Sequence, residues 1–221
     1  PSENNPFYKL DVLQKDALYT LIEEHNITQI YHLAAILSAL GERNPVRAWQ
    51  INMDGLLNVL EAAREKKLEK VYWPSSIAAF GMSAPKDPTP QHTIMEPATV
   101  YGISKHSGEL WCKYYWKKFG VDIRSLRYPG LVSYKAMPGG GTTDYAVDIF
   151  YKALKGEDYT CYLLGNTRLP MMYMPDAVKA TLDLMDAPVR AVRERTSYNI
   201  QAISFSPEEL AAEIRRYYPA L

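Results

Sequence analysis

Glycine is missing from the first forty residues of this 221-residue chain, whose first glycine is Gly41. A glycine-rich turn, Gly-x-x-Gly-x-x-Gly, is what lets a backbone approach a dinucleotide's pyrophosphate and aims a helix N-terminus at it. The acidic residue expected about 20 positions after such a turn is also absent. Instead, the chain opens with the polar stretch Pro1-Ser2-Glu3-Asn4-Asn5-Pro6, which has no strand character.

Cysteine, histidine and net charge are equally scarce. Cys112 and Cys161 lack the spacing of a metal site, and we expect both to be reduced packing residues. The four histidines are scattered, so no metal site is predicted. Twenty-five basic and 25 acidic residues balance, which excludes an electrostatic footprint for nucleic acid or anionic membranes. No apolar run approaches the ~20 residues of a membrane span, and no secretory signal opens the chain. We expect a cytoplasmic protein, or one of the mitochondrial matrix in a eukaryote.

The apolar residues that are present, 47% of the chain, can bury a substantial core. Up to residue 130, predicted helices and strands alternate, which is typical of an α/β fold with a parallel sheet and crossover connections. After residue 130 the elements become mixed, and we place a domain boundary there. The predicted helices are residues 13–24, 45–67, 101–119, 144–154, 176–185 and 207–217. The predicted strands are residues 29–33, 70–73, 122–127, 160–164 and 198–200.

Tyr101 and Lys105 stand four residues apart at the start of a predicted helix. Residues at this spacing share one helical face, roughly 5–6 Å apart at Cβ. A cation there favours the phenolate, so the pKa of Tyr101 would fall from its ordinary value of about 10. Such a tyrosine can take a proton from an alcohol while a cofactor takes the hydride. The alternative is a surface helix with a packing or cation–π pair.

Two serines, Ser75 and Ser76, follow the strand predicted at residues 70–73. Hydroxyls just past a strand's carboxyl end lie where open parallel sheets bind ligands. One of them could donate to a substrate oxygen while Tyr101 removes its proton; the alternative is that both cap a loop. Downstream, Tyr128-Pro129-Gly130 ends another predicted strand at a turn. The three features in this order are more specific than any one of them.

The sequence resembles the extended short-chain dehydrogenase/reductases, and within them the short-chain type of L-threonine 3-dehydrogenase. The similarity runs over nearly the whole chain. Stretches typical of the superfamily are HLAAILSA at 32–39, WPSSIAAFG at 73–81 and YGISK at 101–105, followed by RYPGL at 127–131. Stretches typical of the threonine enzyme are GGGTTDYA at 139–146 and PMMYM at 170–174.

The resemblance implies a Rossmann-like, doubly wound parallel sheet, with a partial NAD-binding domain at residues 1–130. A small substrate-binding lobe of mixed α/β type would occupy residues 131–221. Because the glycine-rich turn is absent, we expect the family's first β-α-β unit to be missing, by truncation or because it is unresolved. The carboxyl end also stops early by the family's standards, just after Pro219.

The resemblance also assigns catalytic roles to four residues. Tyr101 would be the general base, and Lys105 would lower its pKa and hydrogen-bond the nicotinamide ribose. Ser76 matches the family's catalytic hydroxyl, but adjacent Ser75 remains an alternative, because neighbouring side chains swap faces on a strand.

Cofactor contacts are implied mainly at the ends of strands. Asp11 could equally cap a helix, and Ala34 and Ala35 could simply allow tight helix–sheet packing. Asn52 could support Lys105 through water, or make a helix–helix contact. The implied NAD-binding residues are Asp11, Val12, Leu33, Ala34, Ala35, Asn52, Tyr101, Lys105, Tyr128, Pro129 and Leu131.

A zwitterionic amino acid needs donors for its carboxylate. Loop hydroxyls and the backbone N–H groups of residues 139–141 could supply them, although the triple glycine also suits a mobile lid. Asp144 more readily caps the helix that it begins than binds an ammonium group, and residues 171–174 suit adaptable core packing. The implied substrate-binding residues are Ser38, Ser75, Tyr101, Thr142 and Thr143.

The predicted function is NAD-dependent oxidation of the 3-hydroxyl of L-threonine to 2-amino-3-ketobutyrate, a step in threonine catabolism. The alternatives are a nucleotide-sugar 4-epimerase or dehydratase of the same superfamily, and a catalytically incompetent fragment or scaffold of this fold. The apolar stripes of the helices at 45–67 and 101–119 exceed what one buried face requires. In the resembled family such helices form a four-helix interface, so a homodimer is expected.

Overall fold

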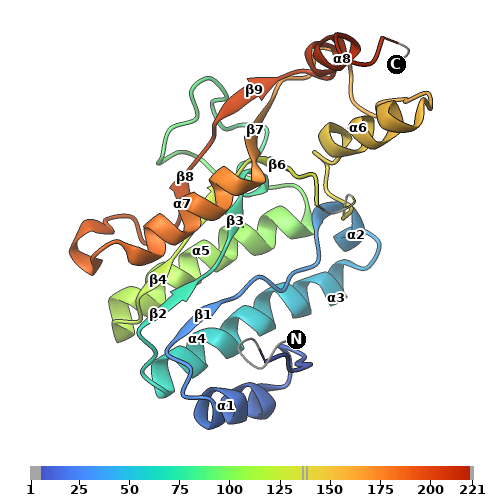
Figure 1. The fold of residues 1–221 in the computed structure, drawn as a ribbon. Coiled ribbons are helices and arrows are strands. Elements are labelled where there is room, and N and C mark those ends of the chain that lie inside the picture. The colour runs from blue at the N-terminus through green and yellow to red at the C-terminus, as the bar shows by residue number, and fades with distance from the viewer. Residues whose placement is uncertain (1–5, 136, 138, 220–221) are drawn as a thin grey trace.

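The computed structural model describes residues 6–135, 137 and 139–219, so most of the polar opening, residues 1–5, lies outside the described residues. Two parallel three-stranded sheets form the centre of the fold (Figure 1). Their orders are β1-β2-β4 and β3-β5-β8. They continue one another, since two residues separate β2 from β3 and one residue separates β4 from β5. The strands are β1 (Gln29–Tyr31), β2 (Lys70–Tyr72), β3 (Ser75–Ser76), β4 (Ile123–Arg124), β5 (Leu126–Tyr128) and β8 (Tyr198–Asn199).

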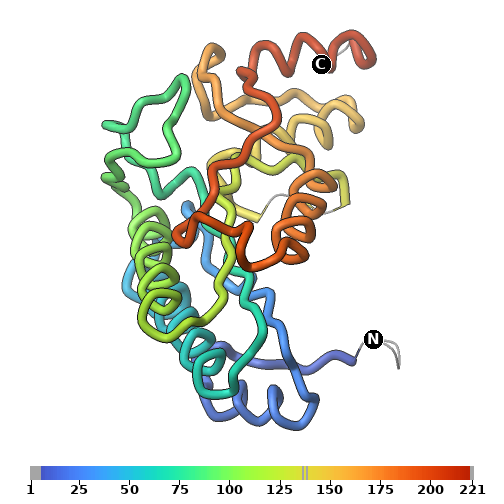
Figure 2. Tube along the Cα trace, turned by 90° about the vertical axis from the view of Figure 1, so that its left-hand side faces the viewer, coloured from blue at the N-terminus to red at the C-terminus, as the bar shows by residue number. Residues whose placement is uncertain are grey.

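Helices cover both faces of this sheet, α4 (Gly55–Glu65) and α5 (Val100–Phe119) on one and α7 (Met174–Asp186) on the other (Figure 2). Successive side chains of a strand point to opposite faces. Val71 accordingly packs in the cluster that holds residues of α4 and α5, whereas Tyr72 packs beside residues of α7. Parallel strands with helices on both faces confirm the predicted Rossmann-like α/β fold.

A third sheet lies beyond residue 130. β6 (Gly130–Val132) pairs in parallel with β7 (Leu169–Tyr173), which pairs antiparallel with β9 (Ile203–Phe205). None of these three strands was predicted from the sequence. Pro170 and the methionines give β7 little strand character, and β6 and β9 are only three residues long. The strand predicted at residues 160–164 is wrong: that segment is irregular and packs its side chains around Tyr145.

The long helix predicted at residues 45–67 is interrupted. It consists of α3 (Pro45–Trp49), a π-helical turn η1 (Gln50–Asp54) and α4. Pro45 occupies the first turn of α3, as expected, and Asn44 Oδ1 accepts a hydrogen bond from the Arg47 N–H. π-turns inside helices are frequent at functional sites, and this one carries Asn52.

Apart from the short α2, which was not predicted, the remaining helices agree with the predictions within a few residues at their ends. They are α1 (Lys15–Glu24), α2 (Ser38–Gly41), α6 (Tyr145–Lys155) and α8 (Pro207–Arg215), with short 3-10 turns η2 (Ile77–Ala79) and η3 (Val189–Ala191). α5 begins at a cap in which Thr99 Oγ1 accepts from the Gly102 N–H, and ends at Gly120 with a left-handed φ of 72°. Within the described part of the chain, no helix combines the length and hydropathy that crossing a membrane requires.

Candidate active site

A cavity of about 510 Å³ opens at the carboxyl ends of the parallel strands. It is bordered by the segments that follow β1 and β2, by the first turn of α5, by residues 128–131, and by the glycine-rich loop before α6. This is the edge at which open α/β sheets bind ligands. Ser76, Tyr101 and Lys105, three of the predicted catalytic residues, border it together.

The first turn of α5 approaches η2 because residue 102 is glycine. A Cβ added to Gly102 would lie 2.3 Å from the carbonyl oxygen of Ala78, closer than any real side chain could be. The missing side chain therefore lets the helix that carries Tyr101 pack directly against the turn that follows Ser76.

The structure separates the two serines, which alternate along β3. Ser75 is buried, and its hydroxyl donates to Glu109 Oε1 at 2.6 Å. Ser76 faces the other way, toward Tyr101, whose pKa its hydroxyl lowers, and its oxygen accepts from the Ala78 N–H at 3.1 Å. Although Ser75 also borders the cavity, the hydroxyl placed beside Tyr101 is that of Ser76.

The expected lowering of the Tyr101 pKa is wrong for this arrangement. Burial raises the pKa of Tyr101, and the hydrogen bond from Ser76 offsets only part of that rise. The ammonium of Lys105 lies over the phenol ring, 5.4 Å from its centroid, and donates to the carbonyl oxygen of Pro74 at 2.5 Å. The spacing alone did not reveal that the phenol of Tyr101 is buried, which is the main cause of its raised pKa.

Lys105 is itself buried, and its Nζ also lies 4.6 Å from the centroid of the Trp73 ring. Burial lowers the pKa of Lys105 to about 8, against smaller opposing effects of Cys112 and Glu109. The same ammonium contributes to the lowered pKa of His32, about 4, for which burial is the larger cause. His32 Nε2 has no hydrogen-bond partner among the described residues.

Asn52 does not border the cavity but holds the loop that does. Its side-chain oxygen accepts from the Ile36 N–H at 2.8 Å, and its amide nitrogen donates to the Ile36 carbonyl at 3.1 Å. The same nitrogen donates to Ser104 Oγ, next to Lys105, at 3.3 Å. Of the two roles left open by the sequence, this geometry favours the helix–helix contact.

Five of the other predicted cofactor residues border the cavity and three do not. Leu33, Ala35, Tyr128, Pro129 and Leu131 are at its edge. The hydroxyl of Tyr128 is engaged elsewhere, with Tyr72 and Thr181.

The three that do not border it are Ala34, Asp11 and Val12. Asp11 Oδ1 accepts from the Leu13 N–H, which makes a local turn ahead of α1 rather than the cap of that helix.

The predicted substrate hydroxyls of Ser38, Thr142 and Thr143 also border the cavity. Two of the backbone N–H groups that were expected to bind the substrate carboxylate already bind the carboxylate of Asp144. Gly140 N–H and Gly141 N–H both donate to Asp144 Oδ2 at 2.7 Å. Asp144 thus orders the glycine loop, and its side chain does not cap α6.

Sequence reasoning missed a buried ion pair beside the site. Glu109 lies on α5 one turn beyond Lys105, and Arg127 lies on β5 directly before Tyr128. The i, i+4, i+8 spacing of Tyr101, Lys105 and Glu109 was the available signal. Over the same described residues, no group of three or more histidine, cysteine or acidic side chains could hold a metal ion.

Comparisons with known proteins show the family of this chain. A model of the NAD dependent epimerase/dehydratase family matches residues 1–200. An uncharacterized epimerase/dehydratase of Staphylococcus haemolyticus is 49% identical over 219 residues, 99% of this chain and 69% of the relative.

Two solved structures are also similar. The holo form of a GalE-like L-threonine dehydrogenase from Cupriavidus necator is 55% identical with a TM-score of 0.96, over 99% of this chain and 71% of that one. The apo form of a monomeric L-threonine 3-dehydrogenase from a metagenome database is 46% identical with a TM-score of 0.94, again over 99% and 71%. The chain belongs to the NAD-dependent epimerase/dehydratase family.

Proposed function

We propose that the protein oxidises the 3-hydroxyl of L-threonine with NAD, giving 2-amino-3-ketobutyrate. The observation that carries the proposal is that the predicted catalytic side chains and the predicted substrate-binding hydroxyls border the same cavity. Ser76, Tyr101 and Lys105 border it from the sheet and α5, and the hydroxyls of Thr142 and Thr143 border it from the loop before α6. The similarity to L-threonine dehydrogenases at 46–55% identity supports the same choice of substrate.

The residues around the cavity fit the nicotinamide end of NAD. Lys105 offers an ammonium group that could hold ribose hydroxyls, and Leu33, Ala35 and Leu131 offer apolar surface. Lys105 is the one cationic side chain among the described residues that border the cavity. The sequence has no glycine before Gly41, so these residues do not by themselves hold the pyrophosphate.

When bound, NAD supplies the hydride acceptor. Tyr101 Oη takes the proton from the substrate hydroxyl, for which it must be a phenolate. The Ser76 hydroxyl donates to that phenolate first and, once Tyr101 has taken the proton, turns its hydrogen to the substrate oxygen as the carbonyl forms. Burial of the phenol keeps water from competing for the proton.

The carboxylate of the amino acid would bind hydroxyls rather than the amides of the glycine loop. Gly140 and Gly141 already donate to Asp144, and displacing that carboxylate would cost two charge-assisted hydrogen bonds. Ser38, Thr142 and Thr143 remain as donors at the same border.

A nucleotide-sugar epimerase or dehydratase is the alternative that the family description allows. Such a substrate carries a diphosphate, which arginine side chains clamp by paired hydrogen bonds. No arginine occurs among the described residues that border the cavity. This favours a small substrate without phosphate groups.

The experiment is a substrate comparison in which NADH formation is followed by absorbance. The protein, extended to the length of its relatives, is supplied with NAD and either L-threonine or L-allo-threonine, which differ only at the hydroxyl-bearing carbon. We expect turnover with L-threonine and at least tenfold less with its epimer. Conversion of a UDP-hexose, without turnover of L-threonine, would overturn the proposal in favour of the epimerase.

We also propose that α5 contributes to a homodimer. Ile103, Leu110, Trp111, Tyr114 and Phe119 on this helix are each 39–52% exposed, which is more apolar surface than an isolated helix face usually shows. The other predicted stripe is largely buried, since Met53, Leu56 and Leu60 belong to the core. One similar dehydrogenase is monomeric. Sedimentation at micromolar concentration distinguishes the two states, and a monomer with full activity would refute the dimer.

A further inference from the structure

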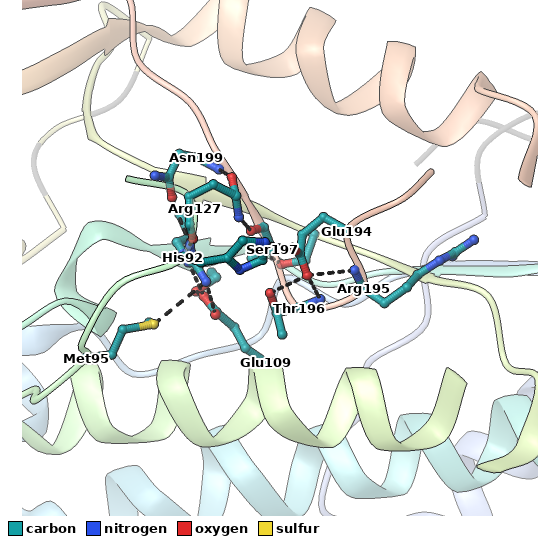
Figure 3. Close-up of polar contacts among 12 residues, drawn as sticks. His92, Met95, Glu109, Arg127, Glu194, Arg195, Thr196, Ser197 and Asn199 are labelled. Carbon is teal, nitrogen blue, oxygen red and sulfur yellow. Dashed lines mark hydrogen bonds and ion pairs between the residues drawn. The ribbon is translucent and has the colours of Figure 1, made fainter. Parts of the chain in front are cut away.

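Glu109 and Arg127 form a fully buried ion pair behind β3 (Figure 3). Arg127 Nε donates to Glu109 Oε1 at 2.8 Å and Arg127 Nη2 donates to Glu109 Oε2 at 2.6 Å. Two parallel bonds of this kind satisfy a carboxylate well without further partners. The pair nevertheless has a third component, the hydroxyl of Ser75, which also donates to Glu109 Oε1.

The hydroxyl of Ser75 connects this pair to the active site. β3 is only two residues long and lies at the edge of its sheet, where β5 is its one partner among the residues that the structure describes. Because successive residues of a strand point to opposite faces, fixing Ser75 toward Glu109 turns Ser76 toward Tyr101. The Pro74 carbonyl and Ser76 Oγ have hydrogen bonds of their own, to Lys105 and to the Ala78 N–H. Within the described part of the chain, the bond to Glu109 is the one that fixes the side chain of Ser75.

The third guanidinium nitrogen of Arg127, Nη1, does not bond Glu109 but is also held by hydrogen bonds. It donates to the carbonyl of Gln91 at 3.0 Å and to Asn199 Oδ1 at 2.9 Å, and the guanidinium lies 5.2 Å from the centroid of the Phe80 ring. The Asn199 amide in turn donates to the carbonyls of residues 89 and 90. Arg127 therefore places Glu109 at a fixed point between α5, β8 and the loop before α5.

We propose that Glu109 is a positioning residue for the reaction: through the hydroxyl of Ser75 it orients Ser76 toward Tyr101. Arg127 holds Glu109 in place for this task. The proposal rests on the proposed function only in requiring that Ser76 and Tyr101 act together on a substrate hydroxyl.

A double-mutant cycle between residues 75 and 76 tests it. Ser75→Ala removes the bond to Glu109 and leaves the Glu109–Arg127 pair intact. We expect it to lower kcat about tenfold, less than the ~10²–10³ lost when a positioned donor is removed outright, with KM changed less than twofold. In the Ser76→Ala background, adding Ser75→Ala should change kcat less than twofold, because the group through which residue 75 acts is already gone.

Ser125→Ala is the matched control. Ser125 is as buried as Ser75, since each is 3% exposed. The hydroxyls of Ser125 and Ser197 are hydrogen-bonded at 2.9 Å, and neither residue borders the cavity. This variant loses a comparable buried hydrogen bond, so it should keep kcat within twofold of the wild type.

A second readout does not depend on turnover. The Cζ resonance of Tyr101, identified by its loss in Tyr101→Phe, reports the hydrogen bond from Ser76 in the folded protein. Ser75→Ala and Ser76→Ala should shift it in the same direction, and Ser125→Ala should leave it in place.

Equal losses of kcat from Ser75→Ala in both backgrounds, or an unshifted Tyr101 resonance, would overturn the positioning role. Failure to oxidise L-threonine would instead overturn the proposed function alone, since the resonance test stands without it.

Discussion

The buried pair of Glu109 and Arg127 makes a quantitative prediction about stability. Their side chains are 1% and 3% exposed, and two hydrogen bonds of 2.6 and 2.8 Å join them. Replacing Glu109 by glutamine keeps the shape of the side chain but leaves the guanidinium buried beside a neutral partner. Removing one member of a buried pair costs about 3–5 kcal/mol. Because glutamine retains one acceptor, we expect the lower end of that range.

A loss of about 3 kcal/mol is large against the 5–15 kcal/mol that stabilises a typical domain. For a chain of this size it corresponds to a fall in Tm of roughly 6–12 °C. The assay is urea unfolding followed by tryptophan fluorescence and circular dichroism, with linear extrapolation to water. The same change at Glu213, whose pair with Arg216 is 54% and 71% exposed, is the matched control.

Glu213→Gln should alter the free energy of unfolding by less than about 0.5 kcal/mol, as exposed pairs do. If Glu109→Gln costs no more than this control, the view of the pair as a fixed anchor behind β3 is refuted.

Three further predictions concern charge and cofactor. Lys105→Met should stabilise the cofactor-free protein by roughly 1–3 kcal/mol at pH 7, since burial lowers the pKa of Lys105 to about 8. That gain should shrink as the pH rises from about 8 to 10.5, where the unfolded chain also loses the proton; a pH-independent difference would contradict it. Burial favours a raised pKa for Asp122, but hydrogen bonds from Arg124 and Arg195 hold its pKa below the ordinary 3.8. Stability should therefore fall with pH below 3.8, and less so in Asp122→Asn; equal acid sensitivity would argue against this. The 221-residue chain should bind NAD more weakly than micromolar, and adding a glycine-rich unit should restore binding; calorimetry showing micromolar affinity for the chain alone would contradict it.

Much of the fold could be predicted because the helices that flank the sheet are long and periodic, and they alternate with short apolar strands. The parallel sheet, α5 and its glycine cap follow from local patterns that tertiary contacts did not override. β7 and β9 could not be predicted, since they are strands only through their pairing with each other and with β6. The π-turn at residues 50–54 escaped for a similar reason, because nothing in the local apolar pattern distinguishes it from an α-helix.

The site was predicted in its parts but not in its electrostatics. The spacing of Tyr101 and Lys105 placed both at one cavity, yet burial raises the pKa of Tyr101 instead of Lys105 lowering it. The serines could not be told apart until the partner of Ser75, Glu109, was known. Desolvation and side-chain pairing depend on residues distant in sequence, so local spacing does not contain them.

The most direct test of the central claim is the turnover of Tyr101→Phe. Its phenol oxygen is required for proton removal only, so kcat with L-threonine should fall by about 10²–10⁴ while the dissociation constant of NAD stays within about threefold. Tyr217→Phe, at a side chain that is 72% exposed and remote from the cavity, should retain full activity. Tyr101→Phe with more than about a hundredth of wild-type turnover would contradict the assignment of Tyr101 as the proton acceptor.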